Sequence, residues 1–373
     1  MFIFAFYFKT NPMASETFFN EPFDEGTRCK LDVFRLYLRE WLPVFLSSPN
    51  PKWMNVNVFD FFSGQGKDAD EVPGSPLITL EELSKSTGYI VNHKLKVRLF
   101  FNEWDSKLFN QLTQNVDPFL KPKVYSTELS NKDFRVCFEE QLPSMKNAAN
   151  LIFLDQKGVK FITSDVFNKL ISLKQTDFMF FISSSFIKRF GESEEFRKYL
   201  KIRSEDIENK DYFHIHRLVL EYYRSLIPPD KQYFLAPFSI RKTPNIYGLI
   251  FGSNHTYGIE KFLKICWKMD KQRGEANFDI DREKINSTTP SLFPDFNKPT
   301  KRKVFEEELE KQVLEKKLDT NYQVYLFTLD NGFLPKDANE ILRQLEKNQK
   351  IILECNLASQ KIHQIPVGSI KVK

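Results

Sequence analysis

Hydrophobic residues follow two kinds of pattern in the first 200 residues. Across 27–46 they recur every three or four positions, which predicts an amphipathic helix that ends near Pro49 and Pro51. Runs that are apolar throughout predict strands at 54–61, 95–101, 134–138, 151–154 and 178–182. Helical patterns lie at 77–84, 105–116, 164–173 and 193–200. Because apolar strands alternate with helices, we expect an α/β fold, a doubly wound parallel sheet covered on both faces.

Two further strands close this region. Residues 232–240 and 247–253 are apolar runs joined by the short turn RKTPN, so we expect antiparallel neighbours at an edge of the sheet. A helix is expected over 258–269. The sequence then becomes polar, with Pro and Asn, up to residue 300, which is typical of a linker between domains.

The end of the chain predicts a second, smaller domain. Helical patterns at 301–318 and 337–347 flank a short apolar patch at 324–329, and two strand-like runs follow at 351–357 and 362–372. Helices followed by a two-stranded ribbon are the order of a winged helix-turn-helix module. The expected organisation is listed by residue range: a tail at 1–26, an α/β domain at 27–270, a linker at 271–300 and a winged-helix-like domain at 301–373.

Composition narrows the setting. With 41% hydrophobic and 28% charged residues the chain has the composition of a soluble globular protein, and its formal net charge of +5 permits contact with nucleic acid without requiring it. The apolar start MFIFAFYF is too short for a membrane span and lacks the features of a signal peptide. We therefore expect no membrane attachment, and translation starting at Met13.

Cysteines and histidines predict neither a metal site nor a disulfide framework. The four cysteines lie far apart without a CxxC pair, which indicates a reduced, cytoplasmic location. His214 and His216 lack a Cys or carboxylate partner at metal-ligand spacing. Ser183 to Ser185 lack the GxSxG elbow of hydrolases, so a hydrolase is not indicated either.

The segment NVFDFFSGQGKD, residues 57–68, leads from a predicted strand into two glycines one residue apart. By itself it fits an ordinary turn as well as a ligand-binding corner. Gly64 and Gly66 would let the backbone approach a ligand at the carboxyl end of the strand. Glu103 ends the next predicted strand, where a carboxylate could accept hydrogen bonds from both hydroxyls of a ribose. This second feature favours a nucleoside-binding corner.

Several motifs resemble a known family. DFFSGQG resembles the first motif of class I S-adenosylmethionine-dependent methyltransferases, in particular the DLFSGxG form of DNA methyltransferases. Together with LYLREWLPVF, PGSPL, LIFLDQKGVKFI and YGLIFGSNHTYGIEKFLKICWKMD, it resembles the three-Cys-motif partner family, TcmP, over 27–270. The resemblance implies a Rossmann-like class I methyltransferase domain and a winged-helix-like tail. It also implies S-adenosylmethionine as the cofactor and a three-Cys-motif protein as a partner.

Carried over residue by residue, the resemblance implies a cofactor site. The implied cofactor-binding residues are Asp60, Ser63, Gly64, Gly66, Glu103 and Glu139. Gly64 and Gly66 would line the methionine portion of S-adenosylmethionine, and Asp60 would hold either the loop or the amino group of the cofactor. Glu103 would bind the ribose. Glu139 or Glu140, after the third predicted strand, would meet the adenine amino group.

The implied catalytic residue is Asp155, which ends the fourth predicted strand where the methyl acceptor would enter. Methyltransferases that modify an amino nitrogen of a base have Asp or Asn there, followed by Pro and an aromatic residue that stacks on the flipped base. Here Asp155 is followed by Gln156, Lys157 and Gly158. Two hypotheses follow. One is a methyltransferase that acts on DNA or RNA presented by the winged helix, and the other is a catalytically altered adaptor that works with a three-Cys-motif protein.

Overall fold

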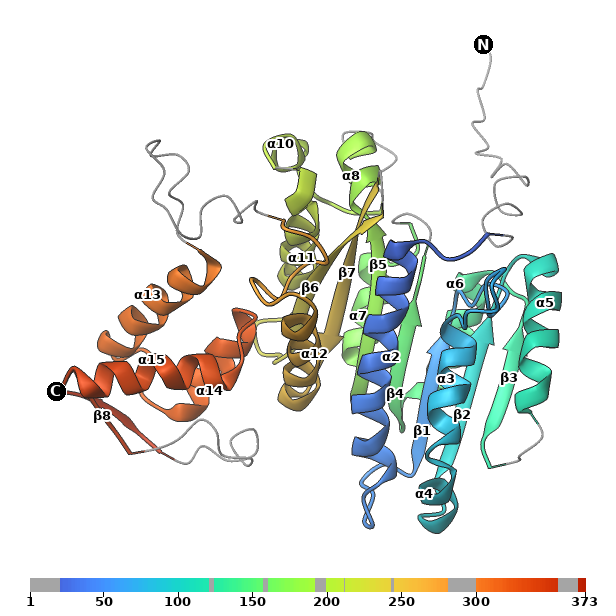
Figure 1. Ribbon diagram of the computed structural model, residues 1–373, viewed down its shortest axis with the longest axis horizontal. Helices are drawn as coiled ribbons and strands as arrows, with labels where there is room; N and C mark the ends of the chain where they lie inside the picture. Colours follow the sequence, from blue (N-terminus) through green and yellow to red (C-terminus); the bar gives the residue numbers. More distant parts are fainter. Residues whose placement is uncertain are drawn as a thin grey trace. The chain divides into compact units, whose positions relative to one another are not determined.

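The computed structural model describes residues 21–120, 124–156, 160–191, 199–210, 212–242, 245–280, 300–354 and 368–373. The chain forms two compact units, 1–148 and 149–373. Their helices and strands are labelled in Figure 1. The first unit contains three parallel strands, β1 (Asn55–Asp60), β2 (Lys96–Asn102) and β3 (Ser126–Ser130). Its helices are α2 (Glu25–Leu46), α3 (Ser75–Ser84), α4 (Thr87–Asn92), α5 (Ser106–Val116), the 3₁₀ turn η1 (Asp117–Phe119) and α6 (Phe134–Met145).

Helices α2 and α3 pack against each other through a buried acid. The Glu82 carboxylate of α3 accepts hydrogen bonds from Arg35 and Arg39 of α2 at 3.0 and 2.9 Å, and from Lys85 at 2.8 Å. Burial by itself raises the pKa of Glu82, but the hydrogen bonds from Arg39, Lys85 and Arg35 outweigh it and lower the pKa to about 2. The acid is therefore ionised at neutral pH, and it fixes α2 on the helix that follows the glycine corner.

The third strand lies elsewhere than the apolar pattern predicted. Residues 134–138 open helix α6, with the Asp133 side chain accepting from the Arg135 N–H at its start. Strand β3 is the polar segment STELS, which pairs with β2 in the register Asn102↔Ser130. The prediction of a strand at 134–138 was wrong because a short apolar run fits one face of a helix equally well.

The second unit contains two parallel strands and an antiparallel hairpin. Strand β4 (Ala149–Leu154) runs parallel to β5 (Gln175–Ser183), and β7 (Asn245–Ser253) runs antiparallel to both β5 and β6 (Phe234–Lys242). The helices around them are α7 (Ser164–Ser172), α8 (Ser184–Phe190), α10 (Ser204–Glu208), η2 (Tyr212–His214), α11 (Ile215–Ser225) and α12 (Thr256–Met269). Most of the helix predicted at 193–200 lies outside the described residues.

The strand order of the larger sheet is β3-β2-β1-β4-β5-β7-β6. This is a mostly parallel sheet with an antiparallel edge hairpin, as expected, and the predicted strands at 54–61, 95–101, 151–154 and 178–182 are confirmed as β1, β2, β4 and β5. Most of their residues are buried, on both faces of the sheet, which explains why their sequences are mainly apolar.

The C-terminal part of the second unit is helical, followed by a two-stranded ribbon. Its elements are α13 (Lys301–Leu314), α14 (Asn321–Asp330), α15 (Pro335–Lys347), β8 (Ile351–Leu353) and β9 (Ile370–Val372). The apolar patch at 324–329 lies within α14, which begins with a capping box between Thr320 and Gln323. The rings of Phe305 and Phe333 stack at 4.1 Å in the core of these helices. The outer parts of the two predicted strands lie outside the described residues.

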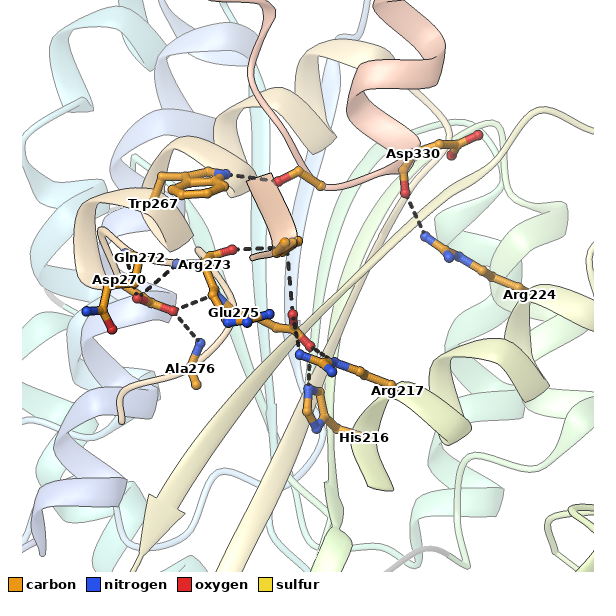
Figure 2. Close-up of polar contacts among 12 residues, drawn as sticks. His216, Arg217, Arg224, Trp267, Asp270, Gln272, Arg273, Glu275, Ala276 and Asp330 are labelled. Atoms are coloured by element: carbon orange, nitrogen blue, oxygen red, sulfur yellow. Dashed lines mark hydrogen bonds and ion pairs between the residues drawn. The ribbon is translucent and has the colours of Figure 1, made fainter. Parts of the chain in front are cut away.

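A buried polar network connects the start of α13 to helix α11 through Glu275 (Figure 2). The Glu275 carboxylate, 4% exposed as a residue, accepts a hydrogen bond from His216 Nε2 at 2.9 Å and is paired with both Arg217 and Lys301. Lys301 Nζ, at the start of α13, also donates to the Arg273 carbonyl at 3.0 Å. Gly274, Glu275, Ala276 and Ile280, in the first part of the predicted linker, are therefore buried, whereas Lys271 and Gln272 are exposed.

Edge strand β6 and the Asp270 turn hold this segment in place. Ser239 N donates to the Glu275 carbonyl at 2.6 Å, and Asn277 N donates to the Ser239 carbonyl at 3.1 Å. The Asp270 carboxylate accepts from the backbone N–H groups of Gln272 and Glu275 at 3.0 and 3.1 Å. These bonds satisfy the backbone of a segment whose polar sequence gave no sign of burial.

Candidate functional site

The carboxyl end of β1 is tied to the start of α3 by one buried acid. Asp60 Oδ1 accepts from the Phe62 N–H at 3.1 Å, and Oδ2 accepts from the Ser75 hydroxyl at 2.6 Å. The Ser63 hydroxyl donates to the Asp60 carbonyl at 3.1 Å. Asp60 and Ser63 thus hold the shape of the turn, which agrees with the loop-holding role that the sequence implied for Asp60.

Both glycines of the corner have left-handed backbone conformations. The φ angle is 60° at Gly64 and 93° at Gly66, a region that residues with a Cβ enter only with strain. The Gly66 carbonyl accepts from the Gly74 N–H at 2.7 Å, so the loop closes on the residue immediately before α3. The segment is therefore a specific, closed turn, and its two glycines are required by the backbone.

Glu103 meets this turn from the neighbouring strand. Strands β1 and β2 are paired in the register Asp60↔Phe101, so their carboxyl ends lie together. Glu103 Oε2 accepts from the Gly64 N–H at 2.9 Å, and Oε1 accepts from the Asp105 N–H at 2.9 Å. The structure thus brings together the acid and the glycine corner that were predicted to act as a pair.

One of the exposed side chains at this edge is aromatic. Ser63, Gly64 and Gly66 are buried and Glu103 is half-buried, whereas Trp104 is 68% exposed. The Asn131 side chain, which follows β3, donates to the carbonyls of Glu103 and Trp104 at 2.6 and 2.9 Å and so fixes their backbone. The sequence interpretation missed Trp104, although an aromatic residue directly after the strand-ending acid in NEWD is a readable signal.

Glu139 and Glu140 do not follow a strand, and the argument for their adenine-binding role is lost. Both are exposed on helix α6, and Glu140 forms a 2.6 Å ion pair with Lys132. The residues that follow the actual third strand are 131–133. The premise failed because the strand itself was placed at 134–138.

Asp155 follows strand β4 in the second unit and is half-buried. Its neighbour Gln156 is buried, with Oε1 accepting from the Phe161 N–H at 2.9 Å. Gln156 Nε2 has no hydrogen-bond partner among the described residues. Lys157 and Gly158 lie outside the described residues. An amide therefore occupies the position that is proline in base-amine methyltransferases.

Other chemistry finds little support in the described part of the chain. There, no group of three or more His, Cys, Asp or Glu side chains is arranged to hold a metal ion. Cys29, Cys137 and Cys266 are buried free thiols, and burial raises the pKa of Cys137 to about 11. None of the described helices has both the length and the apolar character needed to cross a membrane.

Comparison with known proteins identifies the C-terminal domain. Residues 277–354 match the family model described as the GMT-like wHTH domain. No curated protein sequence matches the chain. Among solved structures, the chain is similar to the O-methyltransferase TomG from Streptomyces achromogenes in complex with SAM, at 8% identity and a TM-score of 0.32, over 65% of this chain and 93% of that one. It is also similar to an O-methyltransferase from Bacillus cereus in complex with SAH, at 11% identity and a TM-score of 0.33, over 62% and 91%.

These observations define a class. The chain has an α/β fold, with a mostly parallel seven-stranded sheet that carries antiparallel strands, and a C-terminal winged helix-turn-helix domain. The scores of the two solved structures are too low to transfer residues or an activity. What the site binds must therefore be argued from its own side chains.

Proposed function

We propose that this chain is an S-adenosylmethionine-dependent methyltransferase that acts on nucleic acid, and that it binds the cofactor where β1 and β2 end. One observation carries the proposal: the Glu103 carboxylate and the Gly64 N–H, at the carboxyl ends of two adjacent parallel strands, are 2.9 Å apart. Ligands of open α/β sheets bind at this edge. A carboxylate beside a glycine turn, whose backbone a ligand can approach closely, is also suited to binding a nucleoside.

The residues at this edge fit the parts of S-adenosylmethionine. Glu103 Oε2 accepts the Gly64 N–H and Oε1 accepts the Asp105 N–H, which holds the carboxylate beside the turn, where the ribose of a nucleoside would lie. The exposed indole of Trp104 offers a flat apolar face on which adenine can stack. When bound, the cofactor supplies an electrophilic methyl group for direct attack by an acceptor atom. The protein then has to align the reactants, without forming a covalent intermediate.

The acceptor is assigned to nucleic acid because of the C-terminal domain. Winged helix-turn-helix domains place a helix in a DNA groove. In this proposal Asp155 is the catalytic residue. Its carboxylate accepts a hydrogen bond from the amino group that is methylated, stabilises the positive charge that develops on the nitrogen, and accepts the proton that the nitrogen loses.

Trp104→Ala is expected to weaken S-adenosylmethionine binding about 5- to 150-fold, because stacking of a base on an aromatic side chain is worth about 1–3 kcal/mol. The dissociation constant is measured by equilibrium dialysis with labelled cofactor. Tyr89→Ala is the matched control, since Tyr89 is another exposed aromatic residue, on α4, and should leave binding unchanged. If the Trp104→Ala variant bound the cofactor with wild-type affinity, the Trp104 indole would not be part of the binding site.

Methyl transfer tests the reaction itself. With methyl-labelled S-adenosylmethionine, we expect label to enter duplex DNA, single-stranded DNA or RNA, whichever is the acceptor. Asp155→Asn should reduce the rate about 100-fold or more while leaving cofactor affinity unchanged, because its proposed role is confined to proton and charge handling. Cofactor binding without transfer to any of these nucleic acids would contradict the proposed activity.

The second candidate function is an adaptor. Gln156 favours it, because a buried amide bonded to Phe161 occupies the place of the proline that precedes the stacking aromatic residue in base-amine methyltransferases. Such a protein would keep the fold and the cofactor and would serve a three-Cys-motif protein as its partner. Labelled cofactor that binds but is not consumed, together with co-purification of a three-Cys-motif protein, would favour the adaptor.

A further inference from the structure

The outward face of helix α12 carries a regular row of lysines. Tyr257, Lys261, Lys264 and Lys268 follow one another at intervals of four, three and four residues, which places them on one side of the helix. Lys271 continues the spacing just beyond the helix end. Lys264, Lys268 and Lys271 are exposed, and Lys261 is half-buried. We call Lys261, Lys264, Lys268 and Lys271 the α12 lysine row.

The opposite face of α12 is fully used in packing. Ile259, Phe262 and Cys266 are buried, and the Phe262 ring stacks on Phe251 of β7 at 4.3 Å. The helix covers β6 and β7 with this face (Figure 1). The lysine row therefore lies on the side that points away from the sheet.

The segment that carries the α12 lysine row has a net positive charge. From Thr256 to Arg273 the chain has five cations and two acids, Glu260 and Asp270. Glu260 forms a 2.7 Å ion pair with Lys264 and accepts from the Tyr325 hydroxyl at 2.9 Å. Asp270 caps the following turn. The Lys264 side chain is 55% exposed and an ion pair at the surface contributes only about 0–1 kcal/mol, so Lys264 can leave Glu260, which keeps its bond to Tyr325, and bind another anion.

The chemistry of the row fits a phosphate backbone. Lys261 to Lys268 span about 10 Å along the helix axis, and Lys271 extends the row further. One strand of duplex DNA presents a phosphate about every 3.4 Å along its axis. Consecutive lysines on a rigid helix can therefore contact successive phosphates of one strand.

A membrane surface fits the same helix less well. Interfacial helices insert a free apolar face between lipids, and the apolar face of α12 is buried against the sheet. Tyr257 is the exposed large apolar side chain on α12, and Lys261 lies over its ring at 4.7 Å. A polyanion with a regular charge spacing is the better partner.

We propose that the α12 lysine row binds the phosphate backbone of duplex DNA. It is a binding surface additional to the winged-helix domain in the same unit, and α14 of that domain contacts α12 through Tyr325 and Glu260. The inference rests on the proposed function in one respect, that nucleic acid is the partner. It does not depend on the cofactor site or on catalysis.

The test is a salt series with the full-length triple variant Lys264→Gln, Lys268→Gln, Lys271→Gln. Binding of a fluorescent DNA duplex is measured by anisotropy, and the slope of log K against log salt is expected to become shallower by about 2–3, since each phosphate contact contributes about 0.9. The matched control is Lys52→Gln, Lys96→Gln, Lys146→Gln, which removes the same charge from exposed positions of the first unit. Thermal melting verifies that both variants fold.

An unchanged slope, or an equal change in the two triple variants, would overturn the proposal. A reduction confined to single strands or RNA would overturn the choice of duplex DNA. Cofactor binding and methyl transfer are measured separately on the same variants. If the slope falls as expected while no cofactor binds, the proposed function fails and the lysine row stands. If transfer to nucleic acid persists with an unchanged slope, only the lysine row fails.

Discussion

Replacing Gly64 and Gly66 together by alanine is expected to weaken S-adenosylmethionine binding strongly. Both residues have positive φ angles, which cost a residue with a Cβ about 1–2 kcal/mol each. The strained turn would relax and move the Gly64 N–H away from Glu103. A loss of about 2–4 kcal/mol corresponds to a dissociation constant roughly 30- to 1,000-fold higher, measured by equilibrium dialysis with labelled cofactor.

Gly88→Ala is the matched control for the double variant. A Cβ at Gly88, within α4, would meet no atom within 4 Å, and its φ angle is not in the left-handed region. We expect unchanged cofactor affinity and unchanged or slightly higher stability, because alanine is the better helix former. A double glycine variant that folds and binds the cofactor like the wild type would show that the corner is not the site.

Glu275→Ala should produce the largest loss of stability. The substitution leaves His216, Arg217 and Lys301 without the carboxylate that they share. Removing one partner of a buried ionic cluster typically costs about 3–5 kcal/mol, and we expect the free energy of unfolding to fall by that amount. Urea unfolding at neutral pH measures it. Glu221→Ala, which breaks the exposed pair with Arg224, should change the free energy of unfolding by less than about 1 kcal/mol.

The same cluster predicts how stability depends on pH. Burial by itself raises the pKa of Glu275, but the hydrogen bond from His216, the charge of Lys301 and the hydrogen bond from Arg217 hold that pKa well below its usual value. Burial also lowers the pKa of His216. A carboxylate whose pKa is lower in the folded protein contributes fully to stability at pH values above its pKa in the unfolded chain, near 4.5. It loses that contribution as the pH falls through its pKa in the folded protein.

An equal loss of stability in the Glu275→Ala and Glu221→Ala variants would contradict the importance of the cluster.

Much of the sheet could be predicted because its central strands are buried on both faces. The run LIFL of β4 is an example, because it has no polar position that would suggest a surface helix. Strand β3 could not be predicted in this way, because STELS is an edge strand whose residues are all at least partly exposed. The run FRVCF was taken for a strand instead, although Asp133 before it is a helix N-cap.

The residues of the candidate site could be predicted only where a sequence motif lies directly after a correctly predicted strand. Gly64 and Glu103 satisfy that condition, because each follows a strand of the parallel pair β1 and β2. Glu139 was misplaced together with its strand. Residues 271–280 were expected to be a linker, since nothing in a polar sequence reveals that Glu275 has cationic partners far away along the chain.

Calorimetric titration of the wild-type chain with S-adenosylhomocysteine, the demethylated product, tests the account most directly. We expect saturable binding at one site per chain. Binding should be strongly weakened in the Gly64→Ala, Gly66→Ala variant and unchanged in Gly88→Ala. No measurable binding at ligand concentrations up to the millimolar range would contradict the assignment of the corner between β1 and β2 as a cofactor site.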